Sequence, residues 1–133
     1  MFKISAPQFV KFEENFPEEN TPVEFEVSFG FSVSMDRHCV ACSMTSSFKG
    51  AKGLILLLET ICEFNIENTD WKGFESKDKF VIPKDILQFF AVHTVGTSRG
   101  ILFCKTDNTI LNQFIIPPIN VAELVKDLVI KNR

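Results

Sequence analysis

The chain has 133 residues, a length that suits one domain with a single hydrophobic core. A net charge of −3 with dispersed lysines excludes the clustered positive field that nucleic-acid binding needs. A hydrophobic content of 45% excludes an intrinsically disordered chain, yet no apolar run approaches the roughly 20 residues of a membrane-spanning helix. Because the first residues alternate as in a strand and lack the pattern of a secretory signal, we expect a cytosolic protein.

The first half of the chain predicts four antiparallel strands. From Val23 to Met35 every odd position is apolar and every even position is polar or glycine, which predicts one long strand with a buried and a solvated face. Residues 38–49 lack helical periodicity and predict its return strand. Residues 54–66 predict a third long strand, apolar on both faces at its start. Residues 2–13 predict a first strand interrupted at Pro7, since proline is tolerated at edges and bulges.

The second half predicts helices. Residues 67–79 are charged and turn-like. Pro83 suits a first helical position, and from there to about Leu102 apolar residues spread widely around the helix, so we expect it to be buried on more than one side. The small residues of 96–100 would kink this helix or allow a neighbour to approach closely.

A second helix is predicted near the end of the chain, after a connecting segment over 107–118. Asn120 and Glu123 form the pattern of a capping box, and Ile119 is placed to contact Leu124 as a hydrophobic staple. We expect this helix to bury Leu124, Val125, Leu128 and Val129. The predicted fold is therefore α+β, with a four-stranded antiparallel sheet followed by a long helix and a short C-terminal helix in one domain over residues 1–133.

Four cysteines raise the question of a metal or redox site. Cys39 and Cys42 follow His38 directly, and such a pair is common in zinc sites. On a strand, however, positions 39 and 42 point to opposite faces, and no second Cys or His pair is present. We therefore expect buried, reduced thiols at all four positions, Cys62 and Cys104 included, and no metal.

Candidate catalytic groups are few. His93 lies in the apolar helical segment, where a single histidine usually packs, and His38 lies in a predicted turn. Residues 96–100 resemble an anion cradle but lack the preceding strand and the following lysine. Glu59 and Glu63 share one strand face and are expected to be solvated. We expect no enzymatic activity and no cofactor.

Two late segments resemble the SecB family of protein-export chaperones. They are Gly96–Phe103, with the sequence GTSRGILF, and Phe114–Val121, with the sequence FIIPPINV; Glu63–Ile66 also matches the apolar strand end of that family. In SecB proteins the long helix ends in a comparable small-residue segment with Arg-Gly, and a stretch rich in Leu, Pro and Asn leads into the last helix. The predicted order of strands and helices is similar over nearly the whole chain.

The resemblance implies an ATP-independent holdase that binds unfolded polypeptides or preproteins. It implies a homo-oligomer, a dimer of dimers, with long helices between two sheets and apolar grooves for clients. Fifteen Phe and no Tyr supply apolar area without directional demands, which suits clients of differing sequence. The residues expected to bind clients are Phe12, Phe16, Phe103, Phe114, Ile115, Ile116 and Leu124. The residues expected at the oligomer interface are Phe89, Phe90, His93, Gly96, Thr97 and Gly100.

The sequence departs from the family in two places. The sequence ends at Arg133 without the acidic, metal-binding tail that docks on the translocation motor, and residues 54–58 are apolar where family members carry an acidic docking residue. Docking on the motor stays open, and a SecB-like chaperone associated with a toxin–antitoxin system is an alternative. A carrier of small apolar ligands and a purely structural subunit are further alternatives.

Overall fold

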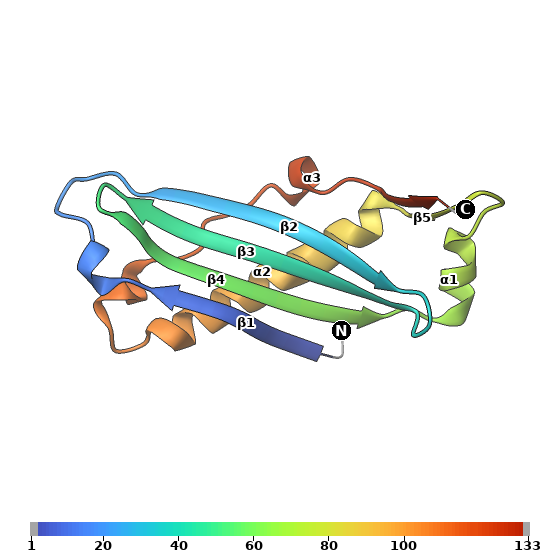
Figure 1. Ribbon diagram of the computed structural model, residues 1–133, viewed down its shortest axis with the longest axis horizontal. Coiled ribbons are helices and arrows are strands. Elements are labelled where there is room, and N and C mark those ends of the chain that lie inside the picture. Colours follow the sequence, from blue (N-terminus) through green and yellow to red (C-terminus); the bar gives the residue numbers. More distant parts are fainter. Residues whose placement is uncertain (1–2, 132–133) are drawn as a thin grey trace.

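The computed structural model describes residues 3–131 and has an α+β fold (Figure 1). Four antiparallel strands form one sheet in the order β1-β4-β3-β2, and two short strands, β5 and β6, form a second sheet. The elements in chain order are β1 (Lys3–Lys11), η1 (Glu13–Asn15), β2 (Glu24–Ser34), β3 (Cys39–Gly50), β4 (Gly53–Asn65), α1 (Asn68–Phe74), β5 (Lys79–Ile82), α2 (Lys84–Thr106), η2 (Ile110–Gln113), α3 (Val121–Leu124) and β6 (Leu128–Lys131). The predicted sheet, long helix and short helix are thereby confirmed.

Strands β2, β3 and β4 form a meander whose alternation separates an apolar from a polar face. β2 pairs with β3 from Glu24 opposite Lys49 to Ser34 opposite Cys39 without any shift in register. Even positions of β3 and β4, such as Met44 and Cys62, are fully buried beneath α2. The odd positions of these two strands lie on the opposite face, except at the start of β4. There the register shifts between Phe48 and Lys49, so that Ile55 is buried in the core and Leu54 lines a hollow on the outer face.

Strand β1 crosses over to pair with the free edge of β4. Its register shifts between Ser5 and Gln8, around Pro7. Proline has no backbone N–H to donate to the ladder, which makes this a favourable place for the irregularity, and Ala6 and Pro7 are both left out of the pairing. The predicted interruption at Pro7 is confirmed.

Helix α2 runs diagonally across the inner face of the sheet (Figure 1) and contacts β3 and β4. Its buried side includes Leu87 and Leu102, and the ring of Phe90 stacks on Phe64 of β4 with centroids 4.0 Å apart. The helix continues without interruption through residues 96–100. The buried hydroxyl of Ser98 is satisfied within the helix, since it donates to the carbonyl of Thr94 at 2.8 Å. It begins at Lys84, one residue later than predicted.

The opposite side of α2 is not covered by any segment of residues 3–131. Phe89, Val92 and Phe103 are 59%, 58% and 59% exposed. The expectation that α2 is buried on more than one side is therefore not met by a single subunit. No helix among residues 3–131 is both long and apolar enough to cross a membrane.

Residues 67–79, expected to be turn-like, contain helix α1 and end at Lys79, the first residue of β5. Trp71 of α1 is only 2% exposed. Its ring stacks on His38 with centroids 4.6 Å apart and contacts Phe80 of β5 at 4.8 Å. His38 is distant from Trp71 in the sequence, so tertiary packing contributes to this short helix beyond its local pattern.

The predicted C-terminal helix is wrong beyond its first turn. α3 has four residues, and the Asn120 side chain forms no capping hydrogen bond. The chain is instead held extended by α2: Gln88 Nε2 donates to the carbonyl of Val125 at 3.0 Å, and the N–H of Lys84 donates to Asp127 Oδ1 at 2.6 Å. Val125 is buried as predicted, but Leu124 on α3 and Val129 in β6 are 51% and 47% exposed, which corrects the prediction for these two residues.

Candidate functional site

A row of phenylalanine rings joins three distant segments at one end of the sheet. Phe16 of the crossover between β1 and β2 meets Phe114 edge to face, with centroids 5.8 Å apart. Phe114 also contacts Phe48 at 5.4 Å, and Phe48 contacts Phe25 at 5.0 Å. Such pairs favour tilted or edge-on contact because each ring has a negative face and a positive edge. The row fixes the position of the chain that follows α2.

That chain, which we call the connector (residues 107–120), is held by an arginine of α2. Arg99 Nε donates to the carbonyl of Ile116 at 3.0 Å, and its Nη2 donates to the carbonyl of Pro117 at 2.8 Å. Asn112 Nδ2 donates to the carbonyl of Phe103 at 3.2 Å. Hydrogen bonds with a charged donor are stronger than neutral ones, so Arg99 is the main polar tie between helix and connector.

Between α2 and the connector lies an apolar hollow of about 320 Å³. We call it the connector hollow, and its lining residues are Arg99, Gly100, Leu102, Phe103, Asn112, Phe114, Ile115 and Ile116. Phe103 is 59% and Ile115 is 70% exposed. An added Cβ at Gly100 would meet no atom within 4 Å, so the helix leaves open space here.

The structure brings four of the predicted client-binding residues together in this hollow. They are Phe103, Phe114, Ile115 and Ile116, although Ile116 is only 2% exposed and so forms part of the core. Phe16 lies against Phe114. The other two predicted residues do not line the hollow: Phe12 is 36% exposed in the crossover, and Leu124 is 51% exposed on α3.

Most of the predicted interface residues are accessible on α2. Phe89, His93, Gly96 and Gly100 are exposed and Thr97 is half-buried, but Phe90 is buried by its stacking on Phe64. The rings of Phe89 and His93 are in contact, with centroids 4.5 Å apart. We had not singled out Val92, which is exposed; its spacing of three from Phe89 and four from Gly96 is the helical signal that identifies it.

Arg99 also separates the connector hollow from a second one. This hollow has a volume of about 410 Å³ and lies between α2, at Val92 and Gly96, and the chain from Pro118 to Val121. Arg99 contributes to the lining of both hollows. Exposed apolar surface therefore continues along α2 on both sides of the arginine.

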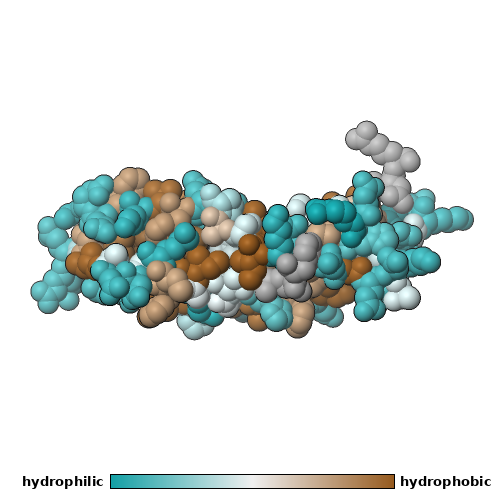
Figure 2. All heavy atoms as spheres, turned by 90° about the horizontal axis from the view of Figure 1, so that it is seen from below, coloured by the Kyte–Doolittle hydropathy of each residue, from teal (hydrophilic) through white to brown (hydrophobic). Residues whose placement is uncertain are grey.

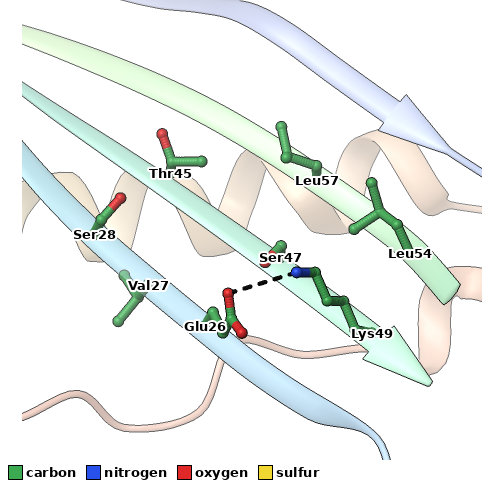
Figure 3. Close-up of a pocket in the computed structure, with 8 residues that line it drawn as sticks. All are labelled: Glu26, Val27, Ser28, Thr45, Ser47, Lys49, Leu54 and Leu57. Carbon is green, nitrogen blue, oxygen red and sulfur yellow. Dashed lines mark ion pairs between the residues drawn. The ribbon is translucent and has the colours of Figure 1, made fainter. Parts of the chain in front are cut away.

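The outer face of the sheet has a different chemistry. Figure 3 shows a hollow of about 410 Å³ on this face, with the small polar side chains of Ser28, Thr45 and Ser47. Lys49 Nζ and Glu26 Oε2 lie 3.9 Å apart at its border. Leu54 and Leu57 of β4 also line this hollow, so the outer face is mainly polar with apolar surface at the start of β4.

The β1 edge is of mixed character. Figure 2, which looks onto this edge, shows apolar residues between hydrophilic ones over its middle and one half. Ile4 is 49% exposed, and Lys105 of α2 places its Nζ 5.3 Å from the centroid of the Phe9 ring. The long side chain of Lys105 thus reaches from α2 to this edge.

The cysteines are free thiols, but not all are buried. Cys39, Cys42 and Cys62 are buried, whereas Cys104 is exposed on α2, which corrects the expectation for that residue. Burial raises the pKa of Cys42 to about 11. Burial also raises the pKa of Cys39, and the negative charge of the neighbouring Glu63 raises it further. No group of three or more potential metal ligands occurs within residues 3–131.

In comparisons with known proteins, no family model, no curated protein and no solved structure matches the chain. The fold and the surface define a class only: an α+β domain whose sheet is covered on one face by a long helix with an exposed apolar side.

Proposed function

We propose that the protein is a SecB-like chaperone, a holdase that binds segments of unfolded polypeptide, preproteins among them, without ATP. The observation that supports this most is the pair Phe103 and Ile115, both more than half exposed on the lining of one hollow. Contiguous exposed apolar surface commonly marks a binding site. Aromatic and aliphatic side chains on this lining make apolar contacts, which need no hydrogen-bond partner in a fixed orientation. Such contacts suit clients that differ in sequence.

A free strand edge supports the same function. The outer edge of β2 pairs with no other strand among the described residues, and its eleven residues contain neither proline nor lysine. The other outer edge of the sheet is β1, which contains Pro7, a register shift and lysines at both ends, Lys3 and Lys11. These features disfavour pairing with a further strand. β2 therefore offers regular backbone donors and acceptors to an extended client.

We further propose that the exposed side of α2 pairs with a sister copy in a homo-oligomer. Phe89 and Val92 supply apolar area, and Gly96 and Gly100 bear no side chain that would keep a neighbouring backbone at a distance. A single subunit leaves this area in water, and burial against a copy stabilises by roughly 25 cal/mol for each Å² removed from solvent. The arrangement is compatible with a dimer of dimers.

The test combines a light-scattering mass with suppression of aggregation of a chemically denatured substrate in the absence of ATP. We expect an oligomer that suppresses aggregation. Ile115→Asp should weaken suppression several-fold without changing the unfolding midpoint, because its side chain is 70% exposed. Ile110→Asp is the matched control, since Ile110 is 50% exposed but does not line the connector hollow.

Three results would contradict the proposal. A stable monomer without suppression would exclude the holdase. A lipid-like molecule that copurifies with the protein would favour the carrier alternative. Equal suppression of aggregation by the parent protein and by Ile115→Asp would show that clients bind outside the connector hollow.

A further inference from the structure

Arg99 is a positive charge without a carboxylate partner. Within residues 3–131 it forms no ion pair, and its hydrogen bonds go to the carbonyls of Ile116 and Pro117. A guanidinium carries five N–H groups, so these bonds leave donors free for a ligand. The side chain is only half-buried, and none of its free donors is sealed from solvent. A bound molecule can therefore reach them.

The surroundings of this charge are otherwise apolar. No other charged side chain lines the connector hollow or the second hollow beside it. The one further polar side chain is that of Asn112, whose Nδ2 already donates to the Phe103 carbonyl and to Thr106 Oγ1, at 3.2 and 3.1 Å. A charge partly withdrawn from water attracts an opposite charge more strongly than a fully solvated one. Arg99 thus favours a ligand that joins an apolar group to an anion.

The position of the guanidinium also limits how a chain can lie in the connector hollow. Because Arg99 reaches from α2 to the connector, it lies across the gap between the two hollows. An extended chain that continued past it would have to cross over the guanidinium. A chain that ends there places its terminal carboxylate on the free donors.

A chain end also matches the close juxtaposition of charge and apolar surface. The terminal carboxylate and the last side chain leave the same Cα, so both can enter the site together. At an internal acidic residue of an extended chain, the two neighbouring side chains point to the opposite face. The lining, with Arg99 next to Gly100 and Phe103, therefore favours a terminus over an internal aspartate or glutamate.

We propose that Arg99 binds the C-terminal carboxylate of a polypeptide whose last residue is large and apolar, with that side chain in the connector hollow. This inference rests on the proposed holdase function and adds to it a preference for exposed chain ends. A hydrogen bond between two charged groups is stronger than one between neutral groups. Capture of a C-terminal carboxylate is a recurring mode of peptide recognition.

The test compares three peptides, labelled at the N-terminus, by fluorescence anisotropy. All contain the same apolar pair, Leu-Phe, at the C-terminal end. The first has a free terminal carboxylate and the second a terminal amide. The third has a terminal amide and a glutamate before the apolar pair, so that its net charge equals that of the first. The parent protein should bind the free acid about tenfold more tightly than either of the others.

Gly100 is a better position for variants than Arg99, which also holds the connector. It lines the hollow, and an added Cβ there would meet no atom within 4 Å. Gly100→Asp places a carboxylate beside Arg99 and should reduce the preference for the free acid to less than about twofold. Gly100→Asn, similar in size but uncharged, should reduce it less. Ile110→Asp adds the same charge outside the hollow and should retain the full preference.

Aggregation suppression, measured on the same proteins, separates this inference from the proposed function. Equal binding of the free acid and the amide by the parent protein would overturn the inference, while intact suppression would leave the holdase standing. Equal binding of the free acid and the glutamate peptide would refute it in favour of acidic residues at any position. Binding of octanoate without binding of any peptide would refute it in favour of a small amphipathic anion. A tenfold preference for the free acid without suppression would support the carboxylate site and contradict the holdase.

Discussion

The rings of Phe16 and Phe114 meet edge to face with centroids 5.8 Å apart, although one belongs to the crossover after β1 and the other to the connector after α2. This contact joins the two irregular segments that flank the sheet. Because Phe114 also contacts Phe48 of β3, the crossover, the connector and the sheet are tied at a single ring.

Phe114→Ala should therefore destabilise the protein markedly. The side chain is partly buried between two other rings, so its loss removes apolar burial and leaves a cavity, at a cost of about 2–4 kcal/mol. Phe103→Ala is the control: 59% exposed, it should change the free energy of unfolding by less than about 0.5 kcal/mol. Urea unfolding of both variants tests this, and equal effects would contradict the packing described.

Arg99→Met should loosen the connector while leaving the sheet intact. Methionine retains much of the apolar stem but donates to neither the Ile116 nor the Pro117 carbonyl, and losing hydrogen bonds from a charged donor costs about 2 kcal/mol. Hydrogen exchange should show faster exchange at connector amides, with β3 amides unaffected. Unchanged connector protection would show that the phenylalanine row alone holds this segment.

Thr60→Val should stabilise the protein by about 1 kcal/mol. Thr60 is fully buried, and its Oγ1 has no hydrogen-bond partner among the described residues. Removing an unsatisfied buried hydroxyl relieves its desolvation cost. Thr94→Val is the matched comparison, because the Thr94 hydroxyl donates to the Phe90 carbonyl at 2.8 Å, and this variant should not gain stability. Thermal unfolding of the pair decides between these outcomes.

Thiol reactivity should distinguish one cysteine from the other three. Cys104 is exposed, so at pH 8 a chromogenic disulfide reagent should modify it rapidly in the native protein. Cys39, Cys42 and Cys62 should react only upon unfolding, and Cys104→Ser should abolish the rapid phase. Rapid modification of Cys42 or Cys62 would indicate that the inner face of the sheet opens, whereas Cys39 lies beside Glu63 on the outer face.

Stability should fall at alkaline pH because of Cys42. Burial raises its pKa from the ordinary 9.0 to about 11, with a smaller contribution from Cys62 and opposition from a hydrogen bond with Thr94. The folded state thus holds this proton more tightly than the unfolded chain does. The associated stability is complete below pH 9 and is lost as the pH rises through about 11. Cys42→Ala should flatten the decline of melting temperature between these values.

The strands of the meander were predictable because their alternation is local. Phe25, Val27 and Phe29 follow one another at intervals of two residues, which predicts a strand with one face turned to the core, and the return strands follow from short turns. The connector hollow was only partly predictable. The sequence marked Phe114 and Ile115 as apolar, but their approach to Gly100 depends on the Arg99 hydrogen bonds, which no local pattern encodes.

The remaining differences have tertiary causes. The capping-box pattern at Asn120 predicted a helix through Val129, but hydrogen bonds from α2 hold Val125 and Asp127 in extended chain. The pairing of Phe80 with Ile130 joins segments that are far apart in the sequence, so neither β5 nor β6 could be seen from its own residues. Helix propensity is a weak preference that such contacts readily override.

The guanidinium of Arg99 contacts carbonyl oxygens of the connector, which every amino acid carries. Mutations at the solvent-facing Ile115 can therefore accumulate over generations without detaching the loop that displays it. The exposed side chains of the connector hollow can therefore change while the backbone that carries them keeps its position. Related proteins with the same connector could in this way differ in the segments that they bind.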